Sequence, residues 1–376
     1  MTTKTRKRAK DIDAPLRFRS WTKSIKVTKA KRQEAKLDLL IERYVADAKR
    51  AETVRLEQKR GFIDVIASAE RVGQHFFPPS IKTVRLDPRK QKKVEFSLDD
   101  LVGYRPDHLA LRPVPERLPR KLQVSRQWRR KEGREDDLGE PGTIFTPDTR
   151  YVFSDTSFPW CTCGRVQTSS GSGSGVMIGP RHLMTASHVI NWGPNNTAGW
   201  VKFTPLQFDT SEPFGVAWAT RIYWWQRVNG GDGISSNEAA FDYVVCVLDR
   251  RLGDTIGWMG SRGYSSDWNG GAYWAHVGYP GDLGGSVRPV FDGSGVIDST
   301  ISESTGGRSS FRMMHRNDYW FGQSGGPAFG WWGSEPWPRV VGIYSAVNWG
   351  VTGGPNANGG GNPLSELINY ARTIEP

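Results

Sequence analysis

The sequence lacks the features that mark membrane proteins and secreted proteins. It contains no run of about 18 or more apolar residues, the length that a membrane-spanning helix needs. Residues Met1–Lys10 are basic but no apolar segment follows them, so they do not match a secretory signal peptide. We therefore expect a cytoplasmic protein without a membrane span, with secretion by another route as the alternative.

Cysteine is also scarce, and its three residues are an odd number. Cys161 and Cys163 lie too close along an extended segment to bridge each other, and Cys246 is distant in sequence. We expect three free thiols, with one bridge from Cys246 to Cys161 or Cys163 as the alternative. The Cys161-Thr-Cys163 pair has no second pair and no nearby His, so we predict no metal site and no cofactor.

Acidic residues are scarce in one part of the chain only. The 376 residues carry a formal net charge of +12, but residues 1–140 hold 36 Lys and Arg against 21 Asp and Glu, a net of +15. Residues 141–376 have a net charge of −3 and contain 38 of the 43 glycines and 14 of the 16 tryptophans. This asymmetry predicts two regions of different character, with the positive charge confined to the first.

The first region reads as basic and largely helical over residues 1–104. Within it, apolar residues recur at steps of three and four and predict a helix over 29–70. The residues that carry this periodicity are Leu37, Ile41, Tyr44, Val45, Ala48 and Ala51. Residues 105–142 are rich in proline and charge, which is the composition of a linker.

The second region, residues 143–376, has the texture of an all-β domain. Short runs of β-branched and aromatic residues, such as Trp200–Phe203 and Val340–Tyr344, alternate with clusters of Gly, Asn, Asp and Ser. Short strands with such turns predict a barrel or a sandwich. Apolar residues at helical spacing in 363–374 predict a short C-terminal helix.

Three local motifs in this β region carry chemistry. His188 closes Thr185-Ala-Ser-His, Asp242 opens an apolar strand, and Ser324 lies in Gly322-Gln-Ser-Gly-Gly-Pro. Each alone has an ordinary structural explanation, because a histidine after a strand, a capping Asp and a glycine-rich turn are all common. Together, in the chain order His, Asp, Ser, they are typical of a serine-hydrolase triad.

With these motifs, residues 143–376 resemble the chymotrypsin-fold serine peptidases, and among them the bacterial glutamyl-endopeptidase branch. The turn Gly278-Tyr-Pro-Gly-Asp282 and the stretch Asp148–Trp160 before the first barrel strand add to the resemblance. It implies an all-β fold, a double six-stranded antiparallel β-barrel, with the basic helical extension before it. The implied parts are a first barrel over about 143–255, a second over about 256–362 and the helix over about 363–374.

The resemblance implies a serine endopeptidase that hydrolyses peptide bonds. Ser324 would form the acyl-enzyme, because a serine hydroxyl attacks a carbonyl once a base removes its proton. His188 would be that general base, and Asp242 would orient its ring. The backbone N–H groups of Gly322 and Ser324 would stabilise the oxyanion, and glycine at 322 would permit the tight turn.

Residues for substrate binding follow from the same resemblance. Asp318 lies where trypsin-type enzymes attract Lys or Arg, whereas Tyr344 replaces the His on which glutamate preference depends, so the preferred side chain stays open. The strand after Tyr344 would pair with the substrate backbone; its residues are Ser345, Ala346 and Val347. Gln323 replaces the Asp that pairs with a newly cut N-terminus in trypsin-type enzymes, so activation by that route is not expected.

Several alternatives remain at this point. The N-terminal region has three: a propeptide removed near residues 140–150, a helical adaptor that docks a partner, or a basic segment that attracts nucleic acid or anionic membrane. It contains no nucleic-acid-binding motif, so we expect a protein or peptide substrate and no obligate nucleic acid. The whole chain has two rivals to the enzyme, an inactive relative that binds peptides and a scaffold dominated by the basic part. Three further histidines of the β region lie outside any such motif: His182, His276 and His315.

Overall fold

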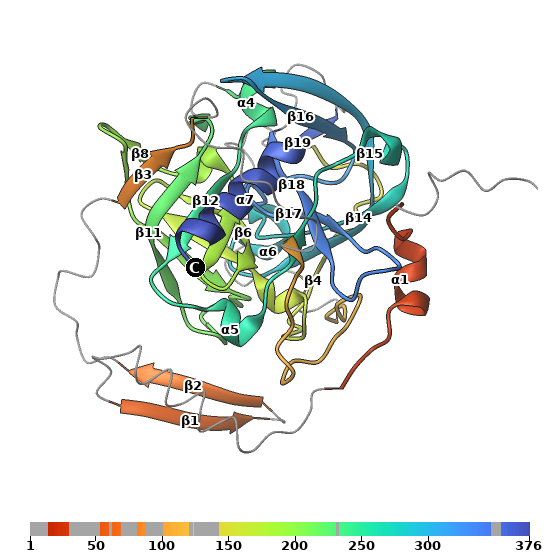
Figure 1. The fold of residues 1–376 in the computed structure, drawn as a ribbon. Coiled ribbons are helices and arrows are strands. Elements are labelled where there is room, and N and C mark those ends of the chain that lie inside the picture. The colour runs from red at the N-terminus through yellow and green to blue at the C-terminus, as the bar shows by residue number, and fades with distance from the viewer. Residues whose placement is uncertain are drawn as a thin grey trace, which may run out of the picture.

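The strands of the protein form two closed antiparallel barrels that lie side by side (Figure 1). The computed structural model describes residues 14–29, 53–59, 62–68, 81–87, 101–119, 123, 143–230, 233–346 and 355–376. The helices of these residues are short apart from the last, which packs against both barrels. They are α1 (Phe18–Ser24), α4 (Ser236–Ala240), α5 (Gly253–Ile256), α6 (Gly281–Gly284) and α7 (Asn362–Ile374), with 3-10 turns η4 (Trp160–Thr162), η5 (Ser187–Val189) and η7 (Ser266–Trp268).

The first barrel closes through the pairing of β10 with β11. Its strand order is β10-β5-β6-β7-β12-β11, and β3, β9 and β8 extend the sheet beyond β11, with β3 parallel to β11. The strands are β3 (Ile81–Arg85), β5 (Cys163–Thr168), β6 (Ser172–Gly179), β7 (His182–Thr185), β8 (Trp192–Gly193), β9 (Thr197–Ala198), β10 (Val201–Pro205), β11 (Ala217–Trp224) and β12 (Val244–Leu248).

The second barrel closes through the pairing of β18 with β19. Its order is β18-β17-β14-β15-β16-β19, with β13 beside β18 and β4 beside β15. The strands are β4 (Tyr151–Val152), β13 (Gly260–Ser261), β14 (Ala272–Gly278), β15 (Val290–Thr305), β16 (Arg308–His315), β17 (Pro327–Gly330), β18 (Arg339–Ala346) and β19 (Asn356–Gly360). The double β-barrel expected from the resemblance is confirmed, and so is the C-terminal helix.

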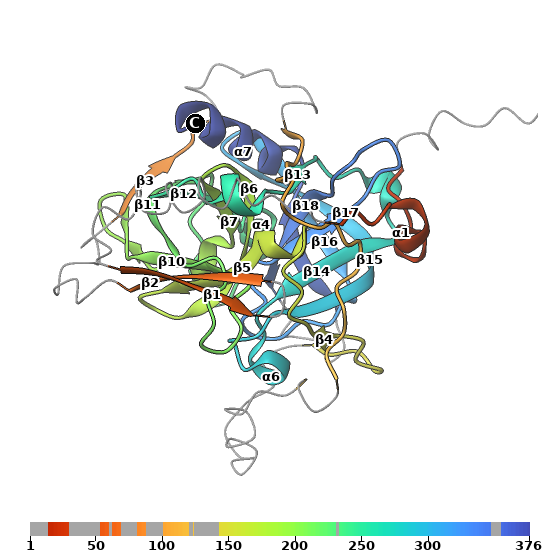
Figure 2. The same ribbon diagram turned by 90° about the horizontal axis from the view of Figure 1, so that it is seen from below.

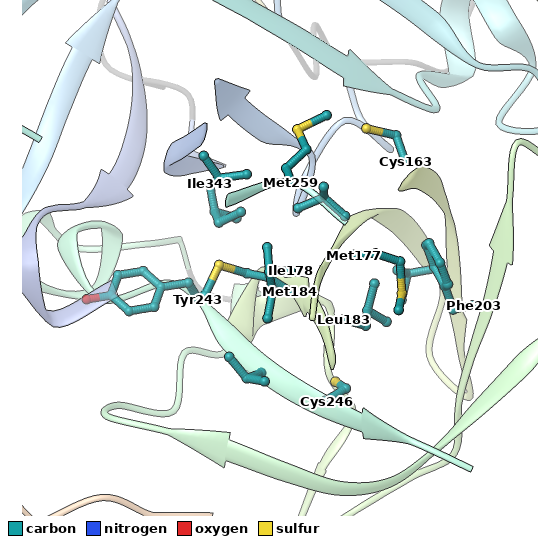
Figure 3. Close-up of a cluster of buried hydrophobic side chains, with 14 of the residues drawn as sticks. Cys163, Met177, Ile178, Leu183, Met184, Phe203, Tyr243, Cys246, Met259 and Ile343 are labelled. Carbon is teal, nitrogen blue, oxygen red and sulfur yellow. The ribbon is translucent and has the colours of Figure 1, made fainter. Parts of the chain in front are cut away.

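One continuous apolar core runs through both barrels. Figure 3 shows part of it, in which Ile178 and Met184 of the first barrel share a cluster with Ile343 of β18. All five residues of β12 are buried, because one side faces the barrel interior while α7 packs against the strand. The three cysteines are free and buried within this core, as expected, and burial raises the pKa of the Cys246 thiol to about 12.

Parts of the N-terminal region pack against the barrels. Trp21 of α1 is 0% exposed and contacts the rings of Phe329 and Trp331. Residues 105–119, which we expected to be part of a linker, also lie against the barrels. Arg117 forms a β-bridge with Phe153, and the carbonyl of Pro115 accepts a hydrogen bond from the Tyr151 hydroxyl at 2.9 Å. Trp21 and the apolar residues Leu109 and Leu111 of this region therefore belong to the core of the β domain.

The helix predicted over residues 29–70 is wrong where the structure describes this stretch. Strands β1 (Thr53–Lys59) and β2 (Phe62–Ser68) form an antiparallel hairpin, a two-stranded sheet of their own, labelled in Figures 1 and 2. Two residues, Arg60-Gly61, separate the strands in the sequence, and a two-residue connection with glycine favours a hairpin. Residues 30–52, which carry the helical periodicity, lie outside the described part. No helix in the described part is long and apolar enough to cross a bilayer.

Candidate active site

The pairing of β7 with β12 brings His188 and Asp242 together. Thr185 at the end of β7 lies opposite Val244 at the start of β12, so the residues just beyond these positions meet at one end of the barrel. His188 Nδ1 lies 2.5 Å from Asp242 Oδ2, and the backbone N–H of His188 donates to Asp242 Oδ1 at 2.8 Å. Two segments that are 54 residues apart in sequence thus form one rigid pair.

The carboxylate of Asp242 is fully buried and receives a third hydrogen bond. The hydroxyl of Ser345 donates to Asp242 Oδ2 at 2.6 Å. A carboxylate only accepts, so it selects the ring tautomer with the proton on Nδ1 of His188 and leaves Nε2 free to take a proton. This arrangement orients a histidine as a general base.

Two glycines with positive φ shape the loop that carries Ser324. Gly322 has φ 97° and Gly325 has φ 85°. A Cβ atom at Gly322 would come within 2.2 Å of the Tyr279 carbonyl oxygen, and one at Gly325 within 2.2 Å of the Ser174 carbonyl oxygen. Both conformation and space therefore require glycine on each side of the serine.

The same loop turns two backbone N–H groups outward. The carbonyl of Phe321 accepts from Gly281 N–H at 2.8 Å, and that of Gln323 accepts from Gly326 N–H at 3.0 Å. In a trans peptide the carbonyl and the next N–H point in opposite directions, so the N–H groups of Gly322 and Ser324 point away from these partners. Within the described residues neither donates to another group, so both remain available as donors.

Ser174 supports this loop from the first barrel, although sequence reasoning missed it. Its hydroxyl donates to the Gly322 carbonyl at 2.6 Å and accepts from Tyr279 N–H at 2.9 Å. Its backbone N–H donates to the Ser324 carbonyl at 2.7 Å. The Gly-Tyr-Pro turn and the Ser324 loop are therefore fixed to β6 of the other barrel.

A buried arginine takes the place of the ion pair that Gln323 cannot form. Arg150 Nη1 donates to Gln323 Oε1 at 3.1 Å, and the guanidinium also binds Asp148 and Asp282 at 2.9 and 2.5 Å. Burial acts to lower the pKa of Arg150, but its hydrogen bonds to the two carboxylates outweigh burial and raise it. The charged network holds Gln323, and with it the loop before Ser324, without a free chain end.

The carboxylate of Asp318 is bound to backbone groups of residues 145 and 149. The residue is 4% exposed, and its carboxylate accepts from the backbone N–H groups of Phe145 at 2.7 Å and Thr149 at 3.4 Å. We call residues 143–150, to which these belong, the lead-in segment. Asp318 therefore holds the lead-in segment, and its place at the floor of a specificity pocket stays a prediction.

The other residues expected at the substrate-binding site divide into two groups. Tyr344 is buried and its ring stacks on His276 at 3.6 Å between centroids, so it contributes to the wall behind the site. Ser345 binds Asp242, and the partly exposed Ala346 ends β18. Val347 lies outside the described residues. Burial lowers the pKa values of the three other histidines in residues 143–376, His182 to about 4 and His276 and His315 to about 3, which keeps these rings neutral at pH 7.

Ser324 itself contacts an unexpected partner. Its hydroxyl lies 2.5 Å from the phenol oxygen of Tyr319, and within the described part of the chain it makes no hydrogen bond to His188. His188 and Asp242 thus form a pair, whereas the hydroxyl of Ser324 is bound to a tyrosine. No sequence signal marked Tyr319, which lies one residue from Asp318 in an otherwise unremarked stretch.

Asp292 is another buried carboxylate, and we expect it to make the stability of the protein depend on pH. Asp292 lines a cavity of about 630 Å³ together with Asp318, and accepts a hydrogen bond from Thr149 Oγ1 at 3.1 Å. Burial, with the Asp318 charge second, raises the pKa of Asp292 from 3.8 to about 7. Between these values the folded protein keeps a proton that the unfolded chain releases, so the free energy of unfolding falls as pH rises.

We therefore expect Asp292→Asn to raise the Tm at pH 8 and to change it little at pH 4, because Asn stays neutral and can still accept from Thr149. Thermal unfolding at both pH values measures this. The control is Asp298→Asn, on the same cavity but 42% exposed and paired with Arg316. A lower Tm of Asp292→Asn at pH 8 would show that the carboxylate is ionised and stabilised there.

The two closed barrels and the pairing of His188 with Asp242 agree with the architecture expected from the resemblance to chymotrypsin-fold serine peptidases. Among curated proteins, the chain is 29% identical over 187 residues to glutamyl endopeptidase of Bacillus licheniformis, covering 50% of this chain and 54% of that protein. It is 26% identical over 190 residues to "extracellular metalloprotease" of Bacillus subtilis, covering 47% and 59%. These comparisons confirm the resemblance to the glutamyl-endopeptidase branch. The chain spans about half the length of the curated relatives that it matches.

Solved structures give the same class of neighbour. A Glu endopeptidase in complex with MPD has a TM-score of 0.48 and 19% identity, over 61% of this chain and 100% of the other. The protease Anisep from Arthrobacter nicotinovorans has a TM-score of 0.41 and 20% identity, over 58% and 98%. No protein-family model matches the chain.

One expectation from the sequence is corrected by these comparisons. The basic N-terminus without an apolar segment led us to expect a cytoplasmic protein. One of the two curated relatives is named as an extracellular protease, which points away from the cytoplasm. The composition of the first residues was thus a poor guide to location.

Proposed function

We propose that the protein is a serine endopeptidase that hydrolyses peptide bonds of protein or peptide substrates through an acyl-enzyme on Ser324. The contact that supports this most directly is that of His188 Nδ1 with the buried Asp242 carboxylate at 2.5 Å. It leaves Nε2 of the ring as the proton acceptor on the side away from the carboxylate. The glycine-flanked loop that carries Ser324 supports the proposal as well, because the N–H groups of Gly322 and Ser324 donate to no other group within the described residues.

The reaction follows from the roles of these groups. His188 Nε2 takes the proton of Ser324 Oγ as the oxygen attacks the scissile carbonyl, and Asp242 stabilises the imidazolium that forms. The N–H groups of Gly322 and Ser324 donate to the oxyanion. The imidazolium then protonates the leaving amine, and a water molecule activated by the same ring hydrolyses the ester.

A fluorophosphonate probe, which reacts with activated serines, tests this function. We expect the wild-type protein to be labelled on Ser324 and to cleave casein, because the site activates that hydroxyl. Ser324→Ala should lose both signals, whereas Ser266→Ala, a change of an exposed serine on η7, should keep both. Absence of labelling and of cleavage in the wild-type protein would contradict the proposal.

The second relative is named a metalloprotease, so treatment with a chelator is a useful further experiment. Within the described residues no group of three or more His, Cys, Asp and Glu side chains is arranged to hold a metal ion. We expect casein cleavage to survive dialysis against EDTA, because each step above is assigned to residues of the chain. Loss of cleavage that added metal restores, with no probe labelling, would favour a metal-dependent reaction over the serine mechanism.

For the N-terminal region we propose that α1, β3 and residues 101–119 are a lasting component of the folded body. Trp21 is 0% exposed among core rings, and β3 is paired with β11 in the first-barrel sheet. Removal of these residues would expose that apolar surface. The division into residues 1–104, 105–142 and 143–376 stays a prediction, as do the partner-docking and nucleic-acid roles of the basic segment.

A further inference from the structure

Tyr319 lies directly beside Ser324, the proposed nucleophile. Its phenol oxygen lies 2.5 Å from Ser324 Oγ and 3.1 Å from the carbonyl oxygen of Ser345, to which it donates. The residue is 3% exposed, so the ring is enclosed by protein. One hydroxyl thus bridges the reacting serine and the strand that we expect to pair with the substrate backbone.

The position of these two groups defines where the residue before the scissile bond must lie. In the proposed reaction its carbonyl carbon approaches Ser324 Oγ while its backbone runs along the strand at Ser345. The side chain of that residue then projects into the wall between the two groups. The ring of Tyr319 lies in this wall, where a long side chain would have to go.

The ring is held from several sides, which keeps it in place. It lies parallel to Tyr344, with centroids 5.9 Å apart and an interplanar angle of 13°, and Tyr344 in turn stacks on His276. The backbone N–H of Tyr319 donates to the Thr143 carbonyl at 3.0 Å, which ties it to the lead-in segment. Moving the ring out would expose a large buried aromatic surface, so a bulky substrate side chain cannot displace it cheaply.

We infer that Tyr319 is a specificity-determining residue: its ring closes the pocket for the side chain before the scissile bond, and its hydroxyl holds Ser324 away from His188 in the free enzyme. The inference rests on the proposed function and specifies its substrate class. Peptide bonds after Gly, Ala or Ser fit the remaining space, whereas bonds after Phe, Leu, Glu or Lys do not. The phenol gives up its bond to Ser324 when the substrate is seated and the serine proton turns to His188.

A peptide series that differs only in the residue before the scissile bond tests the role of the ring. The wild-type enzyme should show the highest kcat/KM with Ala or Gly in that place. Tyr319→Ala should raise the kcat/KM for Phe relative to that for Ala by about 10- to 100-fold, because the space of the ring becomes available. Tyr319→Leu is a second variant with a smaller change in volume, and thermal unfolding shows whether each is folded.

Tyr319→Phe separates the hydroxyl from the ring. The ring remains, so the preference for small residues should be unchanged. Loss of one hydrogen bond frees the hydroxyl of Ser324, so the fluorophosphonate should label it about 2- to 10-fold faster than in the wild-type protein. The matched control is Tyr264→Phe, which removes a hydroxyl bound to Asn269 elsewhere in the second barrel and should leave the labelling rate unchanged.

The outcomes separate this inference from the proposed function. If the wild-type protein is labelled on Ser324 but cleaves best after a large residue, the ring does not close the pocket and the inference is overturned. The same holds if folded Tyr319→Ala and Tyr319→Leu keep the wild-type ranking of peptides. If no variant is labelled and no peptide is cleaved, the proposed function itself fails, and the assignment to Tyr319 fails with it.

Discussion

Replacing Ser324 by Ala should lower kcat/KM by about 10⁴- to 10⁶-fold, by analogy with other triads. The change removes the only atom that can form the acyl-enzyme, while the base and the oxyanion donors stay in place. Those donors can still stabilise attack by water, which is why the loss should stop short of the uncatalysed rate. Turnover of the best peptide substrate measures it, after fluorophosphonate treatment removes traces of wild-type enzyme.

The fold of this variant should be unaffected. Ser324 Oγ bonds only to Tyr319 within the described residues, and that phenol keeps its bond to the Ser345 carbonyl. Thermal unfolding should therefore give a Tm within a few degrees of the wild-type value. A folded Ser324→Ala protein that keeps about a tenth of the wild-type kcat/KM would show that another residue is the nucleophile.

The parts of the site that sequence could predict are those that lie within a few residues of a motif. The turn around Ser324 is determined by neighbouring residues in the sequence, because positions 322 and 325 have positive φ and are both glycine. His188 and Asp242 adjoin apolar strands, and the chain order of the triad supplied the rest. The closed barrels followed from the resemblance, whereas composition alone left a barrel and a sandwich equally open.

The parts that sequence could not predict depend on partners far along the chain. Arg150 and Gln323 are 173 residues apart, and only the folded barrels bring them together. Asp318 lies six residues before the nucleophile, yet its carboxylate is taken by backbone N–H groups of the lead-in segment. The sequence did not indicate a functional role for Tyr319, because an aromatic residue near a glycine-rich turn is usually interpreted as part of the core. Its proposed role rests on its contacts with Ser324 Oγ and with the carbonyl oxygen of Ser345.

The N-terminal hairpin shows the opposite failure, in which a real pattern was extended too far. Apolar residues at helical spacing end at Ala51, but the predicted helix was carried on to residue 70. From Thr53 the sequence instead offers Thr-Val-Arg-Leu, and the structure pairs Thr53 with Ser68 across a hairpin. Charged residues between apolar ones fit the periodicity of a helix and that of a strand, so the short connection with Gly61 was the better indicator of a hairpin.

Asp242→Asn should lower kcat/KM by about 10⁴-fold at neutral pH while leaving the protein folded. An amide has one accepting oxygen where the carboxylate has two. The backbone N–H of His188, which donates to Asp242 Oδ1 at 2.8 Å, cannot change its role and so claims that oxygen. The NH₂ group of Asn then faces His188 Nδ1, which must become the acceptor, and the ring proton moves to Nε2. A ring protonated on Nε2 cannot remove the proton of Ser324.

Ser345→Ala is the matched control for this prediction. It removes the hydroxyl that donates to the same carboxylate at 2.6 Å but leaves both bonds between His188 and Asp242. The tautomer is therefore kept, and the loss in kcat/KM should be about 10-fold or less, as for one hydrogen bond. Steady-state kinetics compares the two variants, and the NMR signal of the Nδ1 proton reports the tautomer directly. Equal losses in both would mean that Asp242 acts by holding the loop together, and a retained Nδ1 proton in Asp242→Asn would refute the tautomer argument.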